Sequence, residues 1–216
     1  NQWSIKALVL TARLSNPLGG TIPEERQKQL LRLASDFDIQ IVEDDIYGEL
    51  MFEQGRTKAL KAFDRLGRVI YCSSFSKTLS SALRVGYLCA SAAIITQLAQ
   101  LKTLTGIGTS RFAEAMVATL LSNGTYRKWV QRLRKRLNAQ MAATLQVLED
   151  EEWQVFAAPA GGMFLWARPG MADPSRLQAC AQRLGVLLSP GALFSPTSER
   201  SEWLRINVAY AADQRA

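Results

Sequence analysis

The chain has 216 residues, of which 48% are hydrophobic and 21% are charged, and its formal net charge is +7 at pH 7. This apolar content is enough for a large buried core, and no apolar run is long enough to predict a transmembrane helix. There is no histidine, which excludes Ser-His-Asp and Cys-His nucleophile systems and histidine metal sites within the chain. Acid–base chemistry therefore has to come from Lys, Tyr, Asp or Glu side chains.

The first ninety residues alternate between short apolar runs and helical segments. Apolar runs predict four strands, over residues 6–12, 39–43, 69–73 and 85–90. A helix is predicted from Thr21 or Pro23 to about Phe37. This alternation predicts a doubly wound α/β sheet, in which polar residues just past the strand ends line the ligand crevice. Asn16, Asp44 and Ser74 are at such positions.

The pattern changes after residue 91. Helices are predicted over about 91–103, 110–122 and 125–150, and the last of these is long and amphipathic. Beyond it, strands are predicted over 153–157, 163–167 and 203–209, with a helix over 174–184. We therefore divide the chain into residues 1–124, a connecting helix over 125–150, and a small α+β domain over 151–216. The ending, residues 211–216, resembles the start of a helix that has been cut short.

The first residues of the chain and its cysteines indicate whether it is part of a longer protein and in which compartment it is found. The chain starts at Asn1, shows no signal peptide and enters an apolar stretch within a few residues, so we expect it to be a piece of a longer protein. Cys72, Cys89 and Cys180 have no metal-like spacing, and their odd number fits reduced thiols in a cytoplasm. We therefore expect a cytoplasmic protein that uses neither a metal site nor a membrane.

Much of the positive charge lies between Tyr126 and Arg136. The basic residues of this stretch are Arg127, Lys128, Arg132, Arg134, Lys135 and Arg136. The simpler interpretation is the solvated face of a long helix, and the alternative is a patch for nucleic acid or an acidic partner. The stretch has no recognition motif, which favours the simpler interpretation.

A lysine lies between hydroxyl side chains at the end of the predicted strand over 69–73. An amine nucleophile for carbonyl chemistry needs a lowered pKa, through desolvation or nearby positive charge. Arg84 follows Lys77 by seven residues and could supply that charge while binding a phosphate, with the hydroxyls of Ser74 and Ser76 as further donors. The alternative is a surface lysine in a Ser-rich loop.

Three consecutive acidic residues, 43–45, directly follow an apolar strand. Buried carboxylates are costly, so they need a cationic partner or a site. A carboxylate that faces a pyridinium nitrogen would keep that nitrogen protonated, as an electron-sink cofactor requires. Tyr47 could hydrogen-bond a ring hydroxyl or lie near Lys77. The alternative is a helix N-cap with acidic residues in its first turn.

Two further residues are candidates. Asn16 precedes Pro17 in a Gly-rich loop, although such loops are also common turns. Arg205 lies between apolar neighbours in an alternating strand and needs an anionic partner. A substrate α-carboxylate is a natural bidentate partner, and a structural salt bridge is the alternative.

In combination, these residues resemble the class I/II aminotransferases of fold type I. The matching residues are, in chain order, Asn16, Asp44 with Tyr47, Ser74-x-Ser76-Lys77, Arg84-x-Gly86 and Arg205. The segments GGMFLW over 161–166 and SPGxxF over 189–194 also resemble small-domain motifs of that family. The resemblance implies that residues 1–124 are the second half of the large domain, an incomplete doubly wound mixed sheet that binds pyridoxal 5′-phosphate (PLP).

The resemblance also implies roles around the cofactor ring. Lys77 would bind PLP as a Schiff base and then shuttle a proton, with Tyr47 beside it as the second catalytic residue. Asp44 would pair with the pyridine nitrogen. Asn16 and Tyr47 would hydrogen-bond the ring oxygen.

The remaining implied roles concern the phosphate and the substrate. Ser74, Ser76 and Arg84 would hold the cofactor phosphate. Arg205 would bind the substrate carboxylate, and Asn16 would be a second substrate-binding residue.

Within this superfamily the chain most resembles the effector domains of GntR-type regulators of the MocR subgroup. The segments 43–47, 71–79 and 126–134 are typical of them. Such bacterial proteins join an N-terminal winged helix-turn-helix domain to an aminotransferase-like sensor, usually as a domain-swapped homodimer. The resemblance therefore implies an amino-acid or other small-molecule effector, a homodimer, and DNA contact only through an upstream domain.

Two alternatives to a regulator remain open. A stand-alone aminotransferase, transferring an amino group between a 2-amino acid and a 2-oxo acid, shares most of these motifs. A scaffold that has lost its cofactor is the third possibility, although Lys77, Asp44 and Arg84 are all present. Whether the longer protein is an enzyme is therefore undecided by the sequence.

The chain departs from the family pattern in two ways. Ser81-Ala82 precedes Leu83-Arg84 where family members often have Pro-Gly or Ser-Gly, so a positive φ there would strain Ala82. The family's first half, which supplies a phosphate-binding helix N-terminus and a stacking ring, has no counterpart here. We therefore expect the chain alone to bind the cofactor poorly, to be inactive, and to expose a sheet edge and apolar surface.

Overall fold

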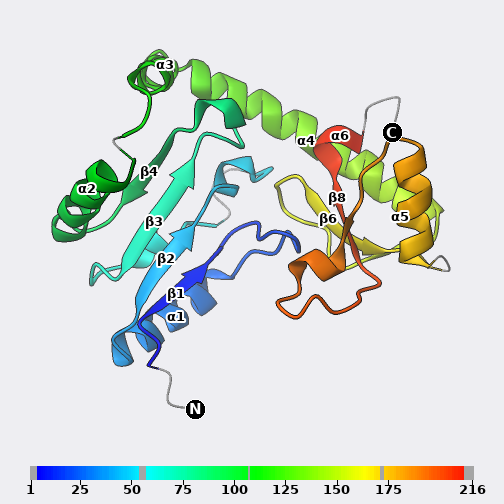
Figure 1. Ribbon diagram of the computed structural model, residues 1–216, viewed down its shortest axis with the longest axis horizontal. Coiled ribbons are helices and arrows are strands. Elements are labelled where there is room, and N and C mark those ends of the chain that lie inside the picture. The colour runs from blue at the N-terminus through cyan, green and yellow to red at the C-terminus, as the bar shows by residue number, and fades with distance from the viewer. Residues whose placement is uncertain (1–3, 54–56, 107, 171–172, 212–216) are drawn as a thin grey trace. The chain divides into compact units, whose positions relative to one another are not determined.

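The computed structural model describes residues 4–53, 57–106, 108–170 and 173–211, and Figure 1 shows their elements in chain order. By its internal contacts the chain divides into two compact units. The first consists of Asn1–Arg13, Thr21–Glu49 and Gln54–Arg132, and the second of Leu14–Gly20, Leu50–Glu53 and Leu133–Ala216. The loop with Asn16 thus belongs to the second unit, although it lies early in the sequence.

A four-stranded mixed sheet forms the centre of the first unit. Its strands, in spatial order, are β1 (Ala7–Leu10), β2 (Gln40–Asp44), β3 (Val69–Ser74) and β4 (Gly86–Cys89). Strands β1, β2 and β3 run parallel to one another, and β4 is antiparallel to β3. All four predicted strands are therefore confirmed, with ends that shift by a few residues. Because β2 and β3 are parallel, Asp44 and Ser74 end their strands at the same edge of the sheet.

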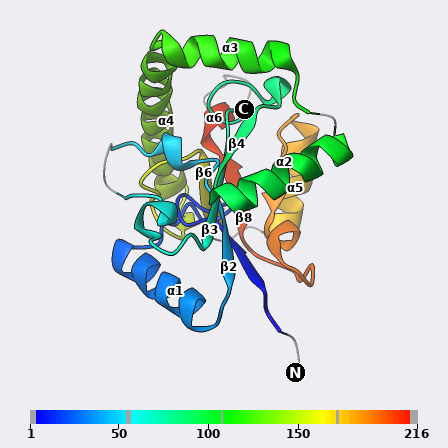
Figure 2. The same cartoon turned by 90° about the vertical axis from the view of Figure 1, so that its left-hand side faces the viewer.

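Two apolar clusters hold the first unit together. Helix α1 (Glu24–Asp36) lies alongside β1 and β2 in Figures 1 and 2, and its buried Ala34 packs against Ile41 and Val69 of the sheet. In the second cluster, Phe75 and Val85 pack against α3 (Arg111–Ser122). Helix α2 (Ala92–Gly106) has no buried residue. Helices α1 and α3 therefore bury side chains in the two apolar clusters, whereas α2 does not.

Helix α4 (Thr125–Asp150) is one continuous helix of 26 residues. Its buried side chains are Val130, Leu137, Met141 and Leu148, which recur at intervals of seven, four and seven residues. This spacing places them on a single stripe of the helix. The helix predicted over 125–150 is therefore confirmed with the same bounds.

The second unit contains a small antiparallel sheet in the order β5-β6-β8-β7. Its strands are β5 (Gln154–Val155), β6 (Phe164–Arg168), β7 (Ser189–Pro190) and β8 (Leu204–Asn207). The unit also has two helices, α5 (Pro174–Arg183) and α6 (Val208–Ala211). Leu165, Ala167 and Leu204 have no solvent exposure and form the centre of its core. This is the small α+β arrangement that the sequence predicts.

Two predictions in the second unit need correction. The strand predicted over 203–209 ends at Asn207, because the Asn207 side chain accepts a hydrogen bond from the backbone N–H of Ala209 (3.1 Å) and α6 begins there. The strand predicted over 153–157 has only two paired residues. The predicted cut-short helix over 211–216 falls mostly outside the described residues. The division of the chain into domains stays a prediction.

The structure explains why glycine occupies positions 161 and 162 in the second unit. A Cβ atom on Gly161 would lie 2.5 Å from the Cα atom of Met51, with which Gly161 forms an isolated β-bridge. Gly162 has a φ of +80°, which side chains rarely adopt. A larger residue at position 161 would push the segment around Met51 away, and one at position 162 would have a strained backbone. Among the described residues, no helix is long and apolar enough to cross a membrane.

Candidate functional site

The three consecutive carboxylates at the end of β2 have different environments. Glu43 is fully buried, and each of its oxygens accepts a backbone N–H, from Leu60 (2.7 Å) and Lys61 (2.8 Å). Burial raises the pKa of Glu43 above its ordinary value, although these two hydrogen bonds oppose the shift. Glu43 therefore serves the fold, by holding the segment that follows residue 59.

Asp45 is also satisfied within the protein. Its side chain is 1% exposed and pairs with the guanidinium of Arg13, whose Nε lies 3.1 Å from Asp45 Oδ1. The hydroxyl of Tyr71 donates a hydrogen bond to Asp45 Oδ2 (2.7 Å). Burial and this carboxylate together raise the pKa of Tyr71, so its hydroxyl stays protonated. The prediction that these acidic residues need a cationic partner is confirmed for Asp45.

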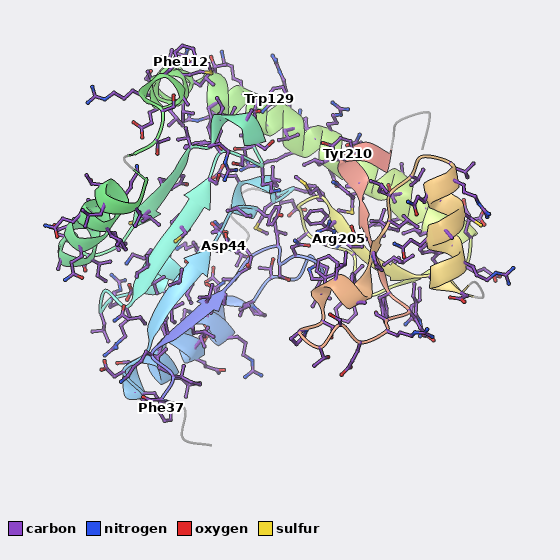
Figure 3. All side chains as sticks on the ribbon, in the orientation of Figure 1. Phe37, Asp44, Phe112, Trp129, Arg205 and Tyr210 are labelled. Atoms are coloured by element: carbon purple, nitrogen blue, oxygen red, sulfur yellow. The ribbon has the colours of Figure 1, made fainter. Side chains whose placement is uncertain are left out.

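Asp44 differs from both of its neighbours. Its Oδ1 is buried and accepts no hydrogen bond from any residue that the structure describes. A buried carboxylate oxygen without a donor costs free energy unless a ligand supplies one. Because Glu43 and Asp45 are occupied, Asp44 is the carboxylate of this run that can receive a cationic N–H group, at the strand end labelled in Figure 3.

Lys77 lies in the turn that follows β3. The hydroxyl of Ser74 lies 2.9 Å from Ser76 Oγ and accepts the backbone N–H of Ser76 (3.1 Å), which fixes the start of this turn. Lys77 is half-buried, and its Nζ lies 5.8 Å from the centroid of the Tyr47 ring. Tyr47 is 5% exposed. The structure thus brings Lys77 and Tyr47 close together, as expected from the sequence.

Two side chains of helix α4 form hydrogen bonds with the turn that contains Lys77. Thr78 is 2% exposed, and its hydroxyl accepts a hydrogen bond from the Tyr126 hydroxyl (3.1 Å). The indole N–H of Trp129 donates to the Thr78 carbonyl (2.6 Å). Sequence reasoning missed both contacts, because nothing in the pattern relates residue 78 to residues about fifty positions later. Thr78 adjoins Lys77, so these contacts also restrict the lysine backbone.

Arg84 has a left-handed backbone conformation, with φ 52° and ψ 35°. It follows the short helix η3 (Ser81–Leu83), and its side chain is exposed. The expected strain is thus at Arg84 rather than at Ala82, which lies inside η3 and has a negative φ. A non-glycine residue held in this region is often associated with a ligand site. Among the described residues Arg84 has no carboxylate partner, so its guanidinium can bind an anion.

In the second unit, Arg205 and Asn16 contact each other. The guanidinium of Arg205 donates to Asn16 Oδ1 (3.0 Å) and to the hydroxyl of Ser189 (3.2 Å). It also lies 4.4 Å from the ring centroid of Phe164 and 5.0 Å from that of Phe194. Its Nε is buried without an acceptor among the described residues. No carboxylate pairs with Arg205 there, so its charge can serve an anionic ligand; Figure 3 labels it beside β8.

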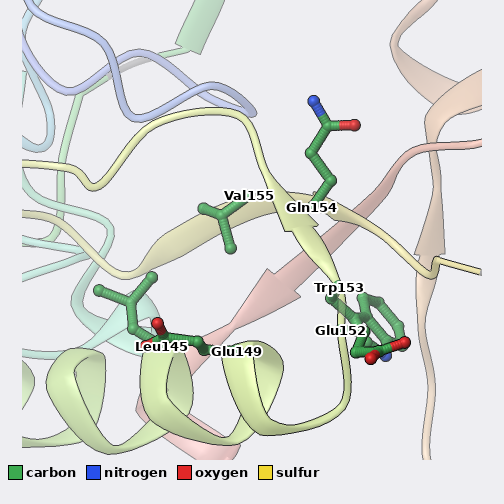
Figure 4. Close-up of a pocket in the computed structure, with 6 residues that line it drawn as sticks. All are labelled: Leu145, Glu149, Glu152, Trp153, Gln154 and Val155. Atoms are coloured by element: carbon green, nitrogen blue, oxygen red, sulfur yellow. The ribbon is translucent and has the colours of Figure 1, made fainter.

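One cavity lies apart from the residues predicted to form the site. It measures about 500 Å³. Figure 4 shows that its lining comes from the end of α4, from β5 and from the turn between them. The lining residues are Leu145, Glu149, Glu152, Trp153, Gln154 and Val155. None of them is a predicted site residue. The described residues contain no cluster of acidic or cysteine side chains that would hold a metal ion.

At the strand ends of the mixed sheet, Asp44 has a buried oxygen without a donor among the described residues, and the turn with Lys77 and the exposed Arg84 lie at the same edge. This arrangement fits an aminotransferase-like protein. The chain belongs to the class I and II aminotransferase family, whose model matches residues 2–215. Membership of this family implies PLP as the cofactor. The donor set fits that group, because Asp44 offers a buried oxygen that lacks a donor.

Similar proteins include both regulators and enzymes. An HTH-type transcriptional regulator of Bacillus subtilis, YisV, is 31% identical over 98% of this chain and 44% of its own length. Aromatic-amino-acid aminotransferase 1 of Thermococcus litoralis is 31% identical over 98% of this chain and 51% of its own. The chain spans about half the length of the curated relatives it matches.

A solved structure confirms the fold class. LysN, an α-aminoadipate aminotransferase of Thermus thermophilus in complex with N-(5′-phosphopyridoxyl)-L-leucine, superimposes with a TM-score of 0.85 at 31% identity. The match covers 94% of this chain and 53% of LysN. The fold is thus part of a fold-type I aminotransferase, as the sequence predicts.

Proposed function

We propose that the chain is the PLP-binding, aminotransferase-like effector domain of a longer bacterial regulator of the GntR/MocR type, with the cofactor bound as a Schiff base to Lys77. The observation that carries the PLP assignment is the buried, donorless Oδ1 of Asp44 between two satisfied carboxylates. The regulator assignment is supported by relatives named as HTH-type regulators, of which this chain matches less than half.

PLP, when bound, supplies an aldehyde for the lysine amine and a protonated ring that accepts electrons. In this proposal the carboxylate of Asp44 keeps the proton on the pyridine nitrogen. Its buried Oδ1 can accept the hydrogen bond from that nitrogen, because no described residue donates to it. Lys77 Nζ holds the cofactor and, once released from it, receives and returns a proton. Tyr47 packs beside that amine and hydrogen-bonds the ring oxygen, together with Asn16.

The outer groups bind anions in this proposal. Ser74, Ser76 and Arg84 hold the phosphate, and the Ser74–Ser76 hydrogen bond places two hydroxyls together. Arg205 binds the carboxylate of an amino-acid effector or substrate. Its guanidinium is already oriented by Asn16 and Ser189, so little side-chain entropy is lost when the carboxylate binds.

The proposal extends to the whole protein. Residues 1–124 are assigned to the large domain, 125–150 to the connecting helix and 151–216 to the small domain. The longer protein is a cytoplasmic homodimer, and an upstream winged-helix domain binds DNA. The upstream DNA-binding domain is supported by the relatives named as HTH-type regulators. The domain bounds, the homodimer and the cytoplasmic location rest on the family resemblance of the sequence.

A second candidate function is a stand-alone aminotransferase. It is favoured by the unpaired Nε of Arg205, which suits a substrate carboxylate, and by relatives that are enzymes. The two candidate functions predict different domains before residue 1 of this chain. A winged-helix domain of roughly 70 to 120 residues there would indicate the regulator, and its absence would indicate the enzyme.

An absorbance titration with PLP tests the proposal. It uses the full-length protein and the 216-residue chain, each as wild type, Lys77→Ala and the exposed-lysine control Lys102→Ala. A band near roughly 420 nm is expected in the full-length wild type and in the control, and its loss is expected in Lys77→Ala. The 216-residue chain is expected to lack the band. A full-length protein without a Lys77-dependent band would contradict the proposal and favour a cofactor-free scaffold.

A further inference from the structure

The charges of α4 run against the dipole of the helix. A helix N-terminus favours acidic side chains and a C-terminus favours basic ones. In α4, Arg127 and Lys128 lie in the first turn and Glu149 and Asp150 in the last. There is no acidic residue in the first turn and no basic residue in the last. Helix stability therefore does not account for this charge distribution.

The buried stripe of α4 fixes the direction in which its basic residues point. Val130, Leu137 and Met141 are at most 2% exposed and face the core. Residues on the opposite side of a helix with 3.6 residues per turn include four basic ones. These are Lys128, Arg132, Lys135 and Arg136, and all four are exposed. We call them the basic face of α4; Figure 3 shows nitrogen-tipped side chains extending from this part of the helix, around Trp129.

The positive charge of the basic face is not neutralised within the described part of the chain. None of its four side chains forms an ion pair with a described residue. The neighbouring Arg134 differs, because it is half-buried and already has a partner. The sequence also has no acidic residue between residues 125 and 148. Four unpaired charges thus lie on one continuous helix over a rise of about 12 Å.

We propose that the basic face of α4 binds the phosphate backbone of DNA, as a second contact beside the upstream DNA-binding domain. The inference rests on the proposed regulator function and revises the expectation that DNA is contacted only upstream. A duplex carries about one negative charge per 1.7 Å of its axis, so an unpaired basic row of this length complements it. We assign phosphate contacts to these four residues, because Lys and Arg bind phosphate oxygens independently of the base sequence.

The test compares DNA binding by full-length wild type and two quadruple variants. The first variant carries Lys128→Gln, Arg132→Gln, Lys135→Gln and Arg136→Gln. The control removes the same charge from exposed positions on other elements, with Arg26→Gln, Arg32→Gln, Lys102→Gln and Arg200→Gln. The probe is a fluorescent mixed-sequence duplex of about 40 base pairs, titrated between roughly 50 and 300 mM salt, because phosphate contacts are independent of sequence.

The expected result is a smaller salt dependence for the basic-face variant only. Each lost phosphate contact lowers the slope of log affinity against log salt by about 0.9, so a decrease of roughly 2 to 4 is expected. The affinity at physiological salt is expected to fall about tenfold or more, while the control changes little. Equal thermal unfolding midpoints for the three proteins would show that the variants fold alike.

Other outcomes overturn the inference in distinguishable ways. Wild-type DNA binding with an unchanged slope in the basic-face variant overturns the inference but leaves the regulator function. An equal loss in the control shows a net-charge effect and also overturns it. If the variant changes the sedimentation of the protein without DNA and leaves the slope intact, the face binds a second copy instead. No binding by wild type at low salt contradicts both the inference and the regulator function.

Discussion

The guanidinium of Arg13 and the carboxylate of Asp45 form a buried ion pair between residues 32 positions apart in the sequence. Arg13 also donates to the carbonyl of Thr57 (3.0 Å), and Tyr71 donates to the same carboxylate. Burial alone would lower the pKa of Arg13, but the paired carboxylate outweighs it and raises the pKa. The pair therefore fixes the segment that begins with Asp44 and ends with Tyr47.

Removing one partner of this pair should be strongly destabilising. In Arg13→Met the carboxylate of Asp45 remains buried without its cation, and such a loss typically costs about 3 to 5 kcal/mol. We expect the free energy of unfolding, measured by urea denaturation, to fall by about that amount. Arg32→Met, on the exposed side of α1, is the control and should change it by less than about 0.5 kcal/mol. A change in Arg13→Met as small as the control would show that the pair is not structural.

Asp44 should matter for the cofactor and little for the fold. Asp44→Ala removes the proposed partner of the pyridine nitrogen, and hydrogen bonds to charged groups contribute about 1.5 to 3 kcal/mol. We therefore expect PLP affinity to decrease about tenfold to 100-fold in the full-length protein, measured by absorbance titration. Because Asp44 Oδ1 has no partner within the described chain, the unfolding free energy should not fall. Unchanged PLP affinity would argue against the assigned role.

The contact between Trp129 and Thr78 should affect the lysine turn. Trp129→Phe keeps an aromatic ring but loses the N–H that donates to the Thr78 carbonyl, which leaves a buried acceptor unsatisfied. We expect the unfolding free energy to fall by about 1 to 3 kcal/mol. Trp153→Phe, far from this turn in sequence, is the control, and equal effects in both variants would contradict the prediction.

Asp64 should make stability depend on pH at the acid end. Burial would raise the pKa of Asp64, but the backbone N–H of Val69 and the ammonium of Lys61 outweigh it, and the pKa lies below 3.8. A carboxyl group whose folded-state pKa is depressed stabilises the protein above its unfolded value. That stabilisation is lost as the pH falls through the folded-state value.

The matching variant is Asp64→Asn. At pH 7 we expect its unfolding free energy to be about 2 kcal/mol below that of wild type, because the amide cannot replace a carboxylate with four donors. The difference should shrink once the pH falls below 3.8, which urea denaturation at several pH values would measure. Asp36→Asn, at an exposed position, should show no such trend. A difference that stays constant down to low pH would contradict the assignment.

The sequence by itself determined the family, the strands and long helices, and the residue types of the site. These features depend on local information: strands follow from short apolar runs, and α4 follows from its amphipathic period. The strand ends of β2 and β3 predicted polar residues at one edge, and Asp44 and Ser74 are there. Motifs such as Ser74-x-Ser76-Lys77 are specific because few folds place such residues together.

Only the tertiary structure showed why Glu43 and Asp45 are not available to a ligand. The family resemblance points to Asp44, but the spacing of residues 43–45 does not reveal the partners of the other two. Their partners, Leu60, Arg13 and Tyr71, come from other elements and lie 17 to 32 positions away. The tertiary structure also revealed the hydrogen bond from Trp129 to the Thr78 carbonyl, and it placed the left-handed backbone at Arg84 rather than at Ala82. Such facts depend on how distant segments pack, which no local pattern encodes.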